Sequence, residues 1–175
     1  MDNHSPAKQN TFYAIGLSYK KADAEIRGKF SLDDKAKANL LEQAKTNGVE
    51  SLLVTSTCNR TEIYGFAQHP FQLIHLLCEN SLGTVEEFQK FAYVYKQKEA
   101  LNHMFRVGTG LDSQILGDFE IIAQLKNAFV ESKKLNLANA YLERLVNSVI
   151  QASKKVKNET EISSGATSVS FAAVQ

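Results

Sequence analysis

The chain has 175 residues, of which 43% are apolar and 22% charged, and its formal net charge is +1. These values are typical of a globular protein with one substantial core, and the near-neutral charge gives no basic field from which a nucleic-acid partner can be argued. Because there is no apolar run of ~18 residues and no basic, apolar leader, we expect a cytoplasmic protein without membrane association.

The first half of the chain alternates between strand and helix patterns. Residues 1–10 are polar and include Pro6, which predicts a disordered lead. Strands are predicted at 12–17, 51–56, 62–67 and 91–95, and helices at 33–45 and 70–80. This order predicts an α+β fold, a ferredoxin-like split βαβ antiparallel sheet with helices packed on it.

The second half of the chain is predicted to be a helical extension. Helical spacing of apolar residues indicates helices at 98–107, 118–135 and 138–157, separated by glycines and by the region of Asn136. Residues 163–175 are small and uncharged and begin a new helical pattern. We therefore expect the chain to be cut shortly after the entry to a further domain, leaving the apolar face of the last long helix partly uncovered.

Cys58 is the main candidate for chemistry. It follows the strand 51–56 and is flanked by Thr57, Asn59 and Arg60, and a nearby guanidinium with turn N–H groups favours the nucleophilic thiolate. A core cysteine packed at a strand end stays open as the alternative. Cys78 has the spacing of a core residue. Neither cysteine belongs to a pair or cluster with metal-ligand spacing, which predicts reduced thiols and no structural metal.

His103 and the glycine-rich segment after it form a second candidate region. The titration range of histidine suits general acid/base chemistry, although a structural histidine is the alternative. Residues 108–120 form a polar loop that ends at a helix N-terminus and lacks the signature of a phosphate or dinucleotide loop. The loop is either a linker capped by Asp118 or a rim that binds ammonium and hydroxyl groups near Cys58.

Four motifs in order resemble glutamyl-tRNA reductase: residues 56–64 (STCNRTEIY), 103–107 (HMFRV), 110–117 (GLDSQILG) and 169–174 (VSFAAV). The resemblance runs from about residue 12 to the last residue. It implies an enzyme of the five-carbon route to 5-aminolevulinate and porphyrins, which reduces the glutamyl ester of its tRNA to glutamate 1-semialdehyde with NADPH. The implied partners are glutamyl-tRNA(Glu) as substrate, a second copy in a homodimer, and glutamate-1-semialdehyde aminotransferase.

The resemblance also implies roles for individual residues. Cys58 matches the nucleophile that forms a glutamyl thioester, and His103 matches a histidine important for activity. Arg60 is the expected fork for the substrate carboxylate. The implied substrate-binding residues are Thr57, Asn59, Arg60, Ser113, Asp118, Phe119, Glu120 and Gln124. The chain departs from the family at 117–120, where Gly-Asp-Phe-Glu stands in place of the common Gly-Glu-Pro-Gln.

The family pattern implies a division of the chain. Residues 11–135 are expected to be the catalytic, glutamyl-binding domain, 136–162 a linker (spinal) helix, and 163–175 the start of an NADPH-binding domain. No dinucleotide fingerprint is present, so no cofactor-binding residue is assigned, and acyl transfer or hydrolysis is the expected activity of this part.

Two other functions stay open. A stand-alone cysteine esterase or acyltransferase would require a direct hydrogen bond between Cys58 and His103. A non-catalytic α+β interaction module would instead hold Cys58 as an inert packed thiol.

Overall fold

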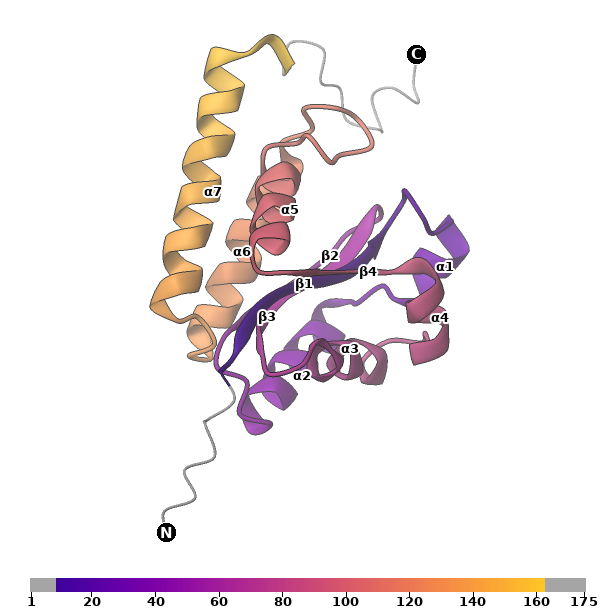
Figure 1. Cartoon of the computed structure of the whole chain (residues 1–175). Helices are drawn as coiled ribbons and strands as arrows, with labels where there is room; N and C mark the ends of the chain where they lie inside the picture. The colour runs from indigo at the N-terminus through magenta and orange to yellow at the C-terminus, as the bar shows by residue number, and fades with distance from the viewer. Residues whose placement is uncertain (1–8, 163–175) are drawn as a thin grey trace.

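A four-stranded sheet forms the middle of the molecule (Figure 1). In the computed structural model, residues 9–162 are described and form four strands and seven helices. The strands are β1 (Thr11–Ser18), β2 (Leu52–Ser56), β3 (Arg60–Ala67) and β4 (Tyr93–Lys96), in the order β2-β3-β1-β4 with antiparallel neighbours. Because β3 lies between β1 and β2, this is the predicted split βαβ arrangement, and the α+β fold class is confirmed.

One face of the sheet is covered by the helices of the first half of the chain. These are α1 (Ala24–Lys29), α2 (Asp34–Thr46), α3 (Pro70–Glu79) and α4 (Val85–Phe91). Alternate strand residues such as Ile15, Val54 and Ile63 point into this core and are at most 4% exposed. Alternate side chains of each strand therefore pack against these helices, and the side chains between them point to the other face of the sheet.

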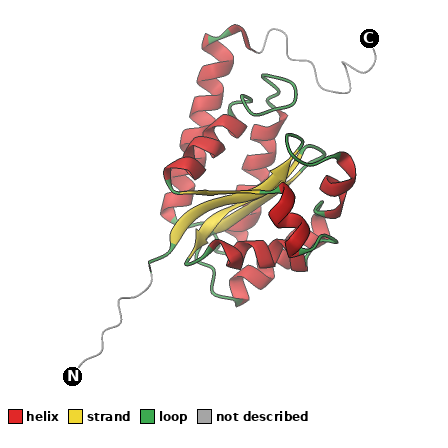
Figure 2. Cartoon of the chain, turned by 45° about the vertical axis from the view of Figure 1, so that its right-hand side comes forward, coloured by secondary structure: helices red, strands yellow, loops and turns green. Residues whose placement is uncertain are grey.

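The other face is covered by α5 (Lys98–Gly108), α6 (Glu120–Lys134) and α7 (Ala140–Glu159). Ala14, Leu53 and Tyr64 on this side pack in a second core with side chains such as Met104 and Val146. Figure 2 shows the strands between the two groups of helices. The strands β1, β2 and β3 are thus buried on both faces, whereas alternate residues of the edge strand β4 stay exposed.

The predicted elements differ from the observed ones in two ways. The short helices α1 and α4 were not predicted, although α4 begins with a capping box in which Thr84 and Glu87 bond each other's backbone N–H. The predicted fourth strand starts too early, because Phe91 ends α4 and β4 begins at Tyr93. The helices α1 and α4 were missed because one or two turns are too short for an apolar period to stand out from the surrounding sequence.

The apolar stripe of α7 is also not uncovered as expected. Leu142, Leu145, Val146 and Val149 are buried at 7% exposure or less against α5 and α6. The predicted lead at 1–10 and the predicted start of a further domain at 163–175 lie largely or wholly outside the described residues.

Candidate functional site

The turn between β2 and β3 carries Cys58 and is held in place by hydrogen bonds. The backbone N–H of Thr57 donates to the carbonyl of Arg60 at 2.8 Å, and the Thr57 hydroxyl accepts from the N–H groups of Asn59 and Arg60 at 3.2 Å each. Hydroxyl-to-backbone bonds of this kind stabilise tight turns. The predicted position of Cys58 on the connection between two strands is confirmed. The hydroxyl of Thr57, an expected substrate contact, is used in hydrogen bonds that stabilise the turn.

Two further contacts fix this turn from outside. The Asn59 carbonyl accepts from the Tyr19 N–H at 2.9 Å, just beyond β1, and the Cys58 carbonyl accepts from the Arg27 guanidinium at 3.0 Å. The side chain of Cys58 is exposed. The alternative of a cysteine packed in the core therefore does not fit its position.

Cys78 has a different environment. It is partly buried on α3, and burial, with smaller contributions from Glu86 and Glu79, raises the pKa of its thiol to about 11. A thiol with so high a pKa stays protonated near neutral pH and is a poor nucleophile. The prediction that Cys78 is a core residue agrees with its packing against the first core.

Arg60 and Glu62 follow the turn on β3 and point to the same side of the sheet as Tyr64, because they alternate along the strand. The Arg60 guanidinium is 3% exposed; its NH1 atom donates to Glu62 Oε1 and to Asp112 Oδ2, each at 3.1 Å, and NH2 donates to the Asp112 carbonyl. Burial alone would lower the pKa of Arg60, but the charge of Glu62 and its neighbours raises it. The Arg60 guanidinium, which was expected to bind the substrate carboxylate, is therefore bound by Glu62 and Asp112 of the protein.

Glu62 is the most enclosed charged group of the site, with no exposed surface. Its carboxylate accepts hydrogen bonds from Arg60, Tyr64, Tyr93 and His103, with Tyr64 Oη and His103 Nε2 both at 2.6 Å. Burial favours the neutral acid, but the bond to His103 and the charges of Arg60 and His103 together lower the pKa of Glu62 to about 2. Glu62 is therefore a carboxylate at neutral pH.

His103 lies on α5 and is 8% exposed. Its ring is 4.9 Å from the ring centroids of Tyr93 and Tyr95, and its Nε2 atom is committed to Glu62. Among residues 9–162 there is no hydrogen bond between His103 and Cys58. The direct cysteine–histidine contact that a stand-alone cysteine esterase requires is thus not observed.

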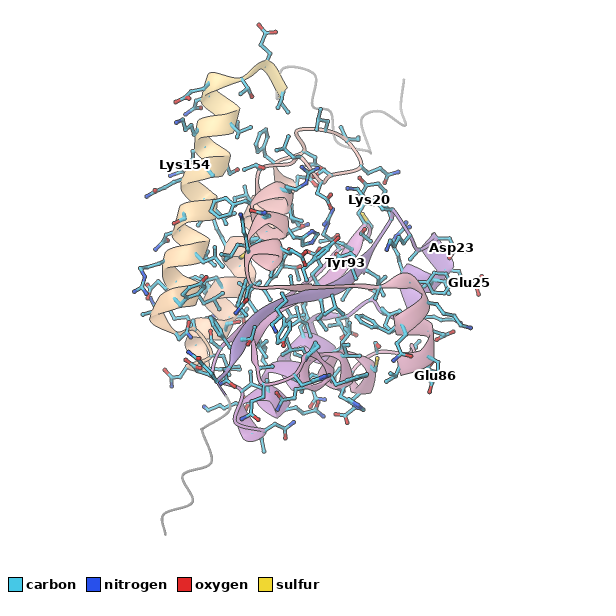
Figure 3. All side chains as sticks on the ribbon, viewed as in Figure 1. Lys20, Asp23, Glu25, Glu86, Tyr93 and Lys154 are labelled. Atoms are coloured by element: carbon cyan, nitrogen blue, oxygen red, sulfur yellow. The ribbon has the colours of Figure 1, made fainter. Side chains whose placement is uncertain are left out.

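The loop between α5 and α6 reaches this network through Asp112, which is 5% exposed. Its carboxylate pairs with Arg60 and with Lys20, and its carbonyl accepts from Arg60 and, at 3.5 Å, from the Tyr19 hydroxyl. Lys20 and Tyr93, both labelled in Figure 3, mark the two ends of a chain of polar contacts that runs Lys20–Asp112–Arg60–Glu62–Tyr93.

The remaining predicted site residues lie on or after this loop. The Ser113 hydroxyl donates to the Asp118 carbonyl at 3.5 Å, and Phe119 is half-buried with the Lys157 ammonium 5.9 Å from its ring centroid. Glu120 and Gln124 are exposed on the first turns of α6. The prediction of Asp118 as N-cap is off by one position: Phe119 is the N-cap, and the Asp118 carboxylate accepts from the Glu120 N–H at 3.0 Å.

Sequence reasoning missed Lys20, Glu62 and Asp112. A signal for Glu62 was present, because Arg60, Glu62 and Tyr64 are spaced by two along one strand, which places their three polar groups on the same face of the sheet. No such signal existed for Lys20 and Asp112, since they meet Arg60 only in the folded chain.

Two classes of feature are not found among residues 9–162. These residues contain no cluster of three or more histidine, cysteine, aspartate or glutamate side chains with the geometry to hold a metal ion. None of their helices is both long enough and apolar enough to cross a membrane.

The chain is similar to proteins of one kind. The family model for the glutamyl-tRNA(Glu) reductase N-terminal domain matches residues 15–160. The glutamyl-tRNA reductase of Flavobacterium psychrophilum is 77% identical over the whole chain, which covers 42% of that protein. The glutamyl-tRNA reductase of Cytophaga hutchinsonii is 38% identical over 95% of the chain, which covers 40% of that protein. The solved structure of the Methanopyrus kandleri glutamyl-tRNA reductase matches 93% of the chain with a TM-score of 0.74 at 26% identity, over 38% of its own length. The chain spans about two fifths of the length of these relatives.

Proposed function

The chain belongs to the glutamyl-tRNA reductase family, whose N-terminal domain it matches over residues 15–160, and on this premise we propose that it performs the acyl-transfer half of that reaction. The thiolate of Cys58 attacks the carbonyl carbon of the glutamyl ester of tRNA(Glu). A carbon–sulfur bond forms, the ester carbon–oxygen bond breaks, and the ribose oxygen takes up the proton that the Cys58 thiol released and leaves as a hydroxyl group. The product is a glutamyl thioester on Cys58, which separates one difficult reduction into two easier steps.

The observation that carries this proposal is the contrast between the two cysteines. Cys58 is exposed at the tip of a turn fixed by backbone and hydroxyl hydrogen bonds, next to a buried polar network, whereas Cys78 is partly buried with a raised pKa. A nucleophile needs both access and a fixed orientation, and a rigid turn supplies both.

The second half of the family reaction is reduction of the thioester to glutamate 1-semialdehyde, for which NADPH is the expected hydride donor. The described residues do not fit a dinucleotide: their single sheet is antiparallel and has no strand followed by a Gly-x-Gly-x-x-Gly turn. No step of the reduction is therefore assigned to residues of this chain. Homodimer formation and transfer of product to glutamate-1-semialdehyde aminotransferase belong to the same proposal and rest on the family resemblance.

We assign substrate carboxylate recognition to Arg60 in exchange with Asp112. The Asp112 carboxylate and carbonyl already present Arg60 with the acceptor oxygens that a bound glutamate would offer. When the loop between α5 and α6 moves away from Arg60, a substrate carboxylate replaces Asp112 as the partner of the guanidinium. Lys20, which is half-exposed beside Asp112, adds positive charge there. The proposed substrate site also includes Thr57, Asn59, Ser113, Asp118, Phe119, Glu120 and Gln124.

The experiment is intact-protein mass spectrometry of the chain after mixing with glutamyl-tRNA. We expect a glutamyl adduct that maps to Cys58 and is removed by hydroxylamine, no adduct on Cys58→Ser, and an undiminished adduct on the matched control Cys78→Ser. Adduct formation by folded Cys58→Ser, or its absence from the folded wild-type chain, would contradict the proposal.

A second readout follows the fate of the thioester. Because no hydride donor site is assigned among residues 9–162, water attacks the thioester carbonyl and releases free glutamate while the Cys58 thiol is restored. We expect glutamate as the product even when NADPH is added. Formation of glutamate 1-semialdehyde by this chain would show that the reduction step resides in these residues.

A further inference from the structure

The Glu62 carboxylate draws its four hydrogen-bond donors from three elements. Arg60 and Tyr64 lie on β3, Tyr93 on β4 and His103 on α5. Oε1 accepts from Arg60, Tyr93 and His103, and Oε2 from Tyr64. With no exposed surface and both oxygens engaged, Glu62 has no room to touch a substrate. Any effect on chemistry must pass through the groups that it holds.

Gly16 explains how one carboxylate can reach all three elements. β1 lies between β3 and β4, and Gly16 is the β1 residue in register with both Glu62 and Tyr93. A Cβ atom at this position would lie 2.8 Å from Glu62 Cγ and closer still to the Thr61 carbonyl oxygen. Only glycine therefore leaves space for the Glu62 side chain to cross over the middle strand to Tyr93.

We propose that Glu62 is a positioning residue for acyl transfer at Cys58, fixing Arg60 through NH1 and His103 through Nε2. This inference rests on the function proposed above and deepens it. Because the Nε2–H of His103 donates to a carboxylate, the neutral ring keeps its lone pair on Nδ1. Nδ1 is then the ring nitrogen left to take or return a proton during the reaction, and the hydrogen bond from Nε2 to Glu62 fixes the orientation of the ring.

The same contact fixes the guanidinium two residues beyond the nucleophile. NH1 of Arg60 is shared between Glu62 and Asp112, so Glu62 keeps the guanidinium in place when Asp112 is exchanged for a substrate carboxylate. A buried Arg60 with neither partner would be an unpaired charge, which proteins avoid. Glu62 thus prepares both the anion site and the orientation of His103 before substrate arrives.

Two tyrosines on β4 provide a matched pair of test variants. The hydroxyl of Tyr93 donates to Glu62, whereas Tyr95 has its ring at the same 4.9 Å from His103 and makes no hydrogen bond to Glu62. Tyr93→Phe removes one donor from Oε1 with the ring contact kept, and Tyr95→Phe removes a hydroxyl that plays no part in the network. Glu62→Gln keeps the side-chain size while replacing one acceptor oxygen and the charge.

The test combines ¹⁵N NMR of the His103 ring with single-turnover acylation by glutamyl-tRNA. We expect the wild-type ring to carry its proton on Nε2, and the Nε2 resonance to change in Glu62→Gln and Tyr93→Phe but not in Tyr95→Phe. The acylation rate constant should fall roughly tenfold or more in Glu62→Gln, as expected for a lost charge-assisted hydrogen bond. In Tyr93→Phe it should fall with the half-saturating glutamyl-tRNA concentration unchanged.

The outcomes separate this inference from the function on which it rests. A neutral wild-type ring protonated on Nδ1, or unchanged His103 resonances and acylation rate in folded Glu62→Gln and Tyr93→Phe, would overturn the role of Glu62. Absence of any adduct on the wild-type chain overturns acyl transfer instead. In that case the NMR comparison, which needs no tRNA, still decides whether Glu62 holds His103. If Glu62→Gln does not fold, Tyr93→Phe and its control decide alone.

Discussion

Replacement of Glu62 by glutamine should remove a defined, pH-dependent part of the stability of this protein. The pKa of Glu62 is about 2 in the folded chain against an ordinary value of 4.5. Because the folded state holds this proton more weakly, the stabilisation is fully present above about pH 4.5 and is lost as the pH falls toward about 2. Its size is about 3 kcal/mol.

In Glu62→Gln this contribution is absent at every pH. The variant also leaves Arg60 buried with Asp112 as its remaining carboxylate partner. Removing one partner of a buried ion pair costs about 3–5 kcal/mol, so a loss of roughly 3 kcal/mol near neutral pH follows from both arguments. The difference in unfolding free energy between wild type and variant should therefore be largest above about pH 4.5 and shrink as the pH falls toward about 2.

The assay is urea unfolding followed by circular dichroism over a series of pH values, with the difference between the two proteins as the measured quantity. Carboxylates that do not contact Arg60 have the same surroundings in both proteins, so their contributions cancel in the difference. Glu42→Gln is a suitable control, since Glu42 is an exposed carboxylate on α2 whose side chain makes no hydrogen bond within residues 9–162. A difference between wild type and Glu62→Gln that is the same at every pH would refute the assignment of Glu62 as a buried, paired carboxylate.

Three further outcomes follow from the structure. Gly16→Ala should lower the unfolding free energy by about 1–3 kcal/mol in the same urea assay, because its Cβ overlaps the Thr61 carbonyl oxygen; a stability equal to wild type would show that the strands can separate freely. Asp112→Asn should speed amide hydrogen exchange in residues 109–119, because the loop loses its ion pair with Arg60. It should also lower the glutamyl-tRNA concentration that half-saturates acylation, because the Asp112 carboxylate no longer competes for Arg60; a higher concentration would instead make Asp112 a substrate ligand. Iodoacetamide near neutral pH should leave Cys78 unmodified until the chain unfolds, as peptide mapping can check, because burial raises its pKa to about 11.

The sequence alone was enough to predict the fold class and the position of Cys58 between two strands. Apolar residues spaced by two indicate the buried face of a strand, and apolar residues spaced by three and four indicate that of a helix. These patterns identified all four strands and the five longer helices. Cys58 was placed correctly on the connection between two strands, because polar residues interrupt two apolar runs there. The short helices α1 and α4 escaped, since one or two turns carry too little periodicity.

Tertiary structure decided how the site is connected. Glu62 is 41 residues from His103, and Arg60 is 52 residues from Asp112, yet each pair is joined by a hydrogen bond. Periodicity describes one element at a time, whereas these contacts depend on the strand order, on the register that sets Glu62 opposite Gly16, and on the face to which α5 returns. For this reason the family resemblance implied Arg60 as the fork for the substrate carboxylate, and only the folded chain shows its guanidinium held between two carboxylates of the protein.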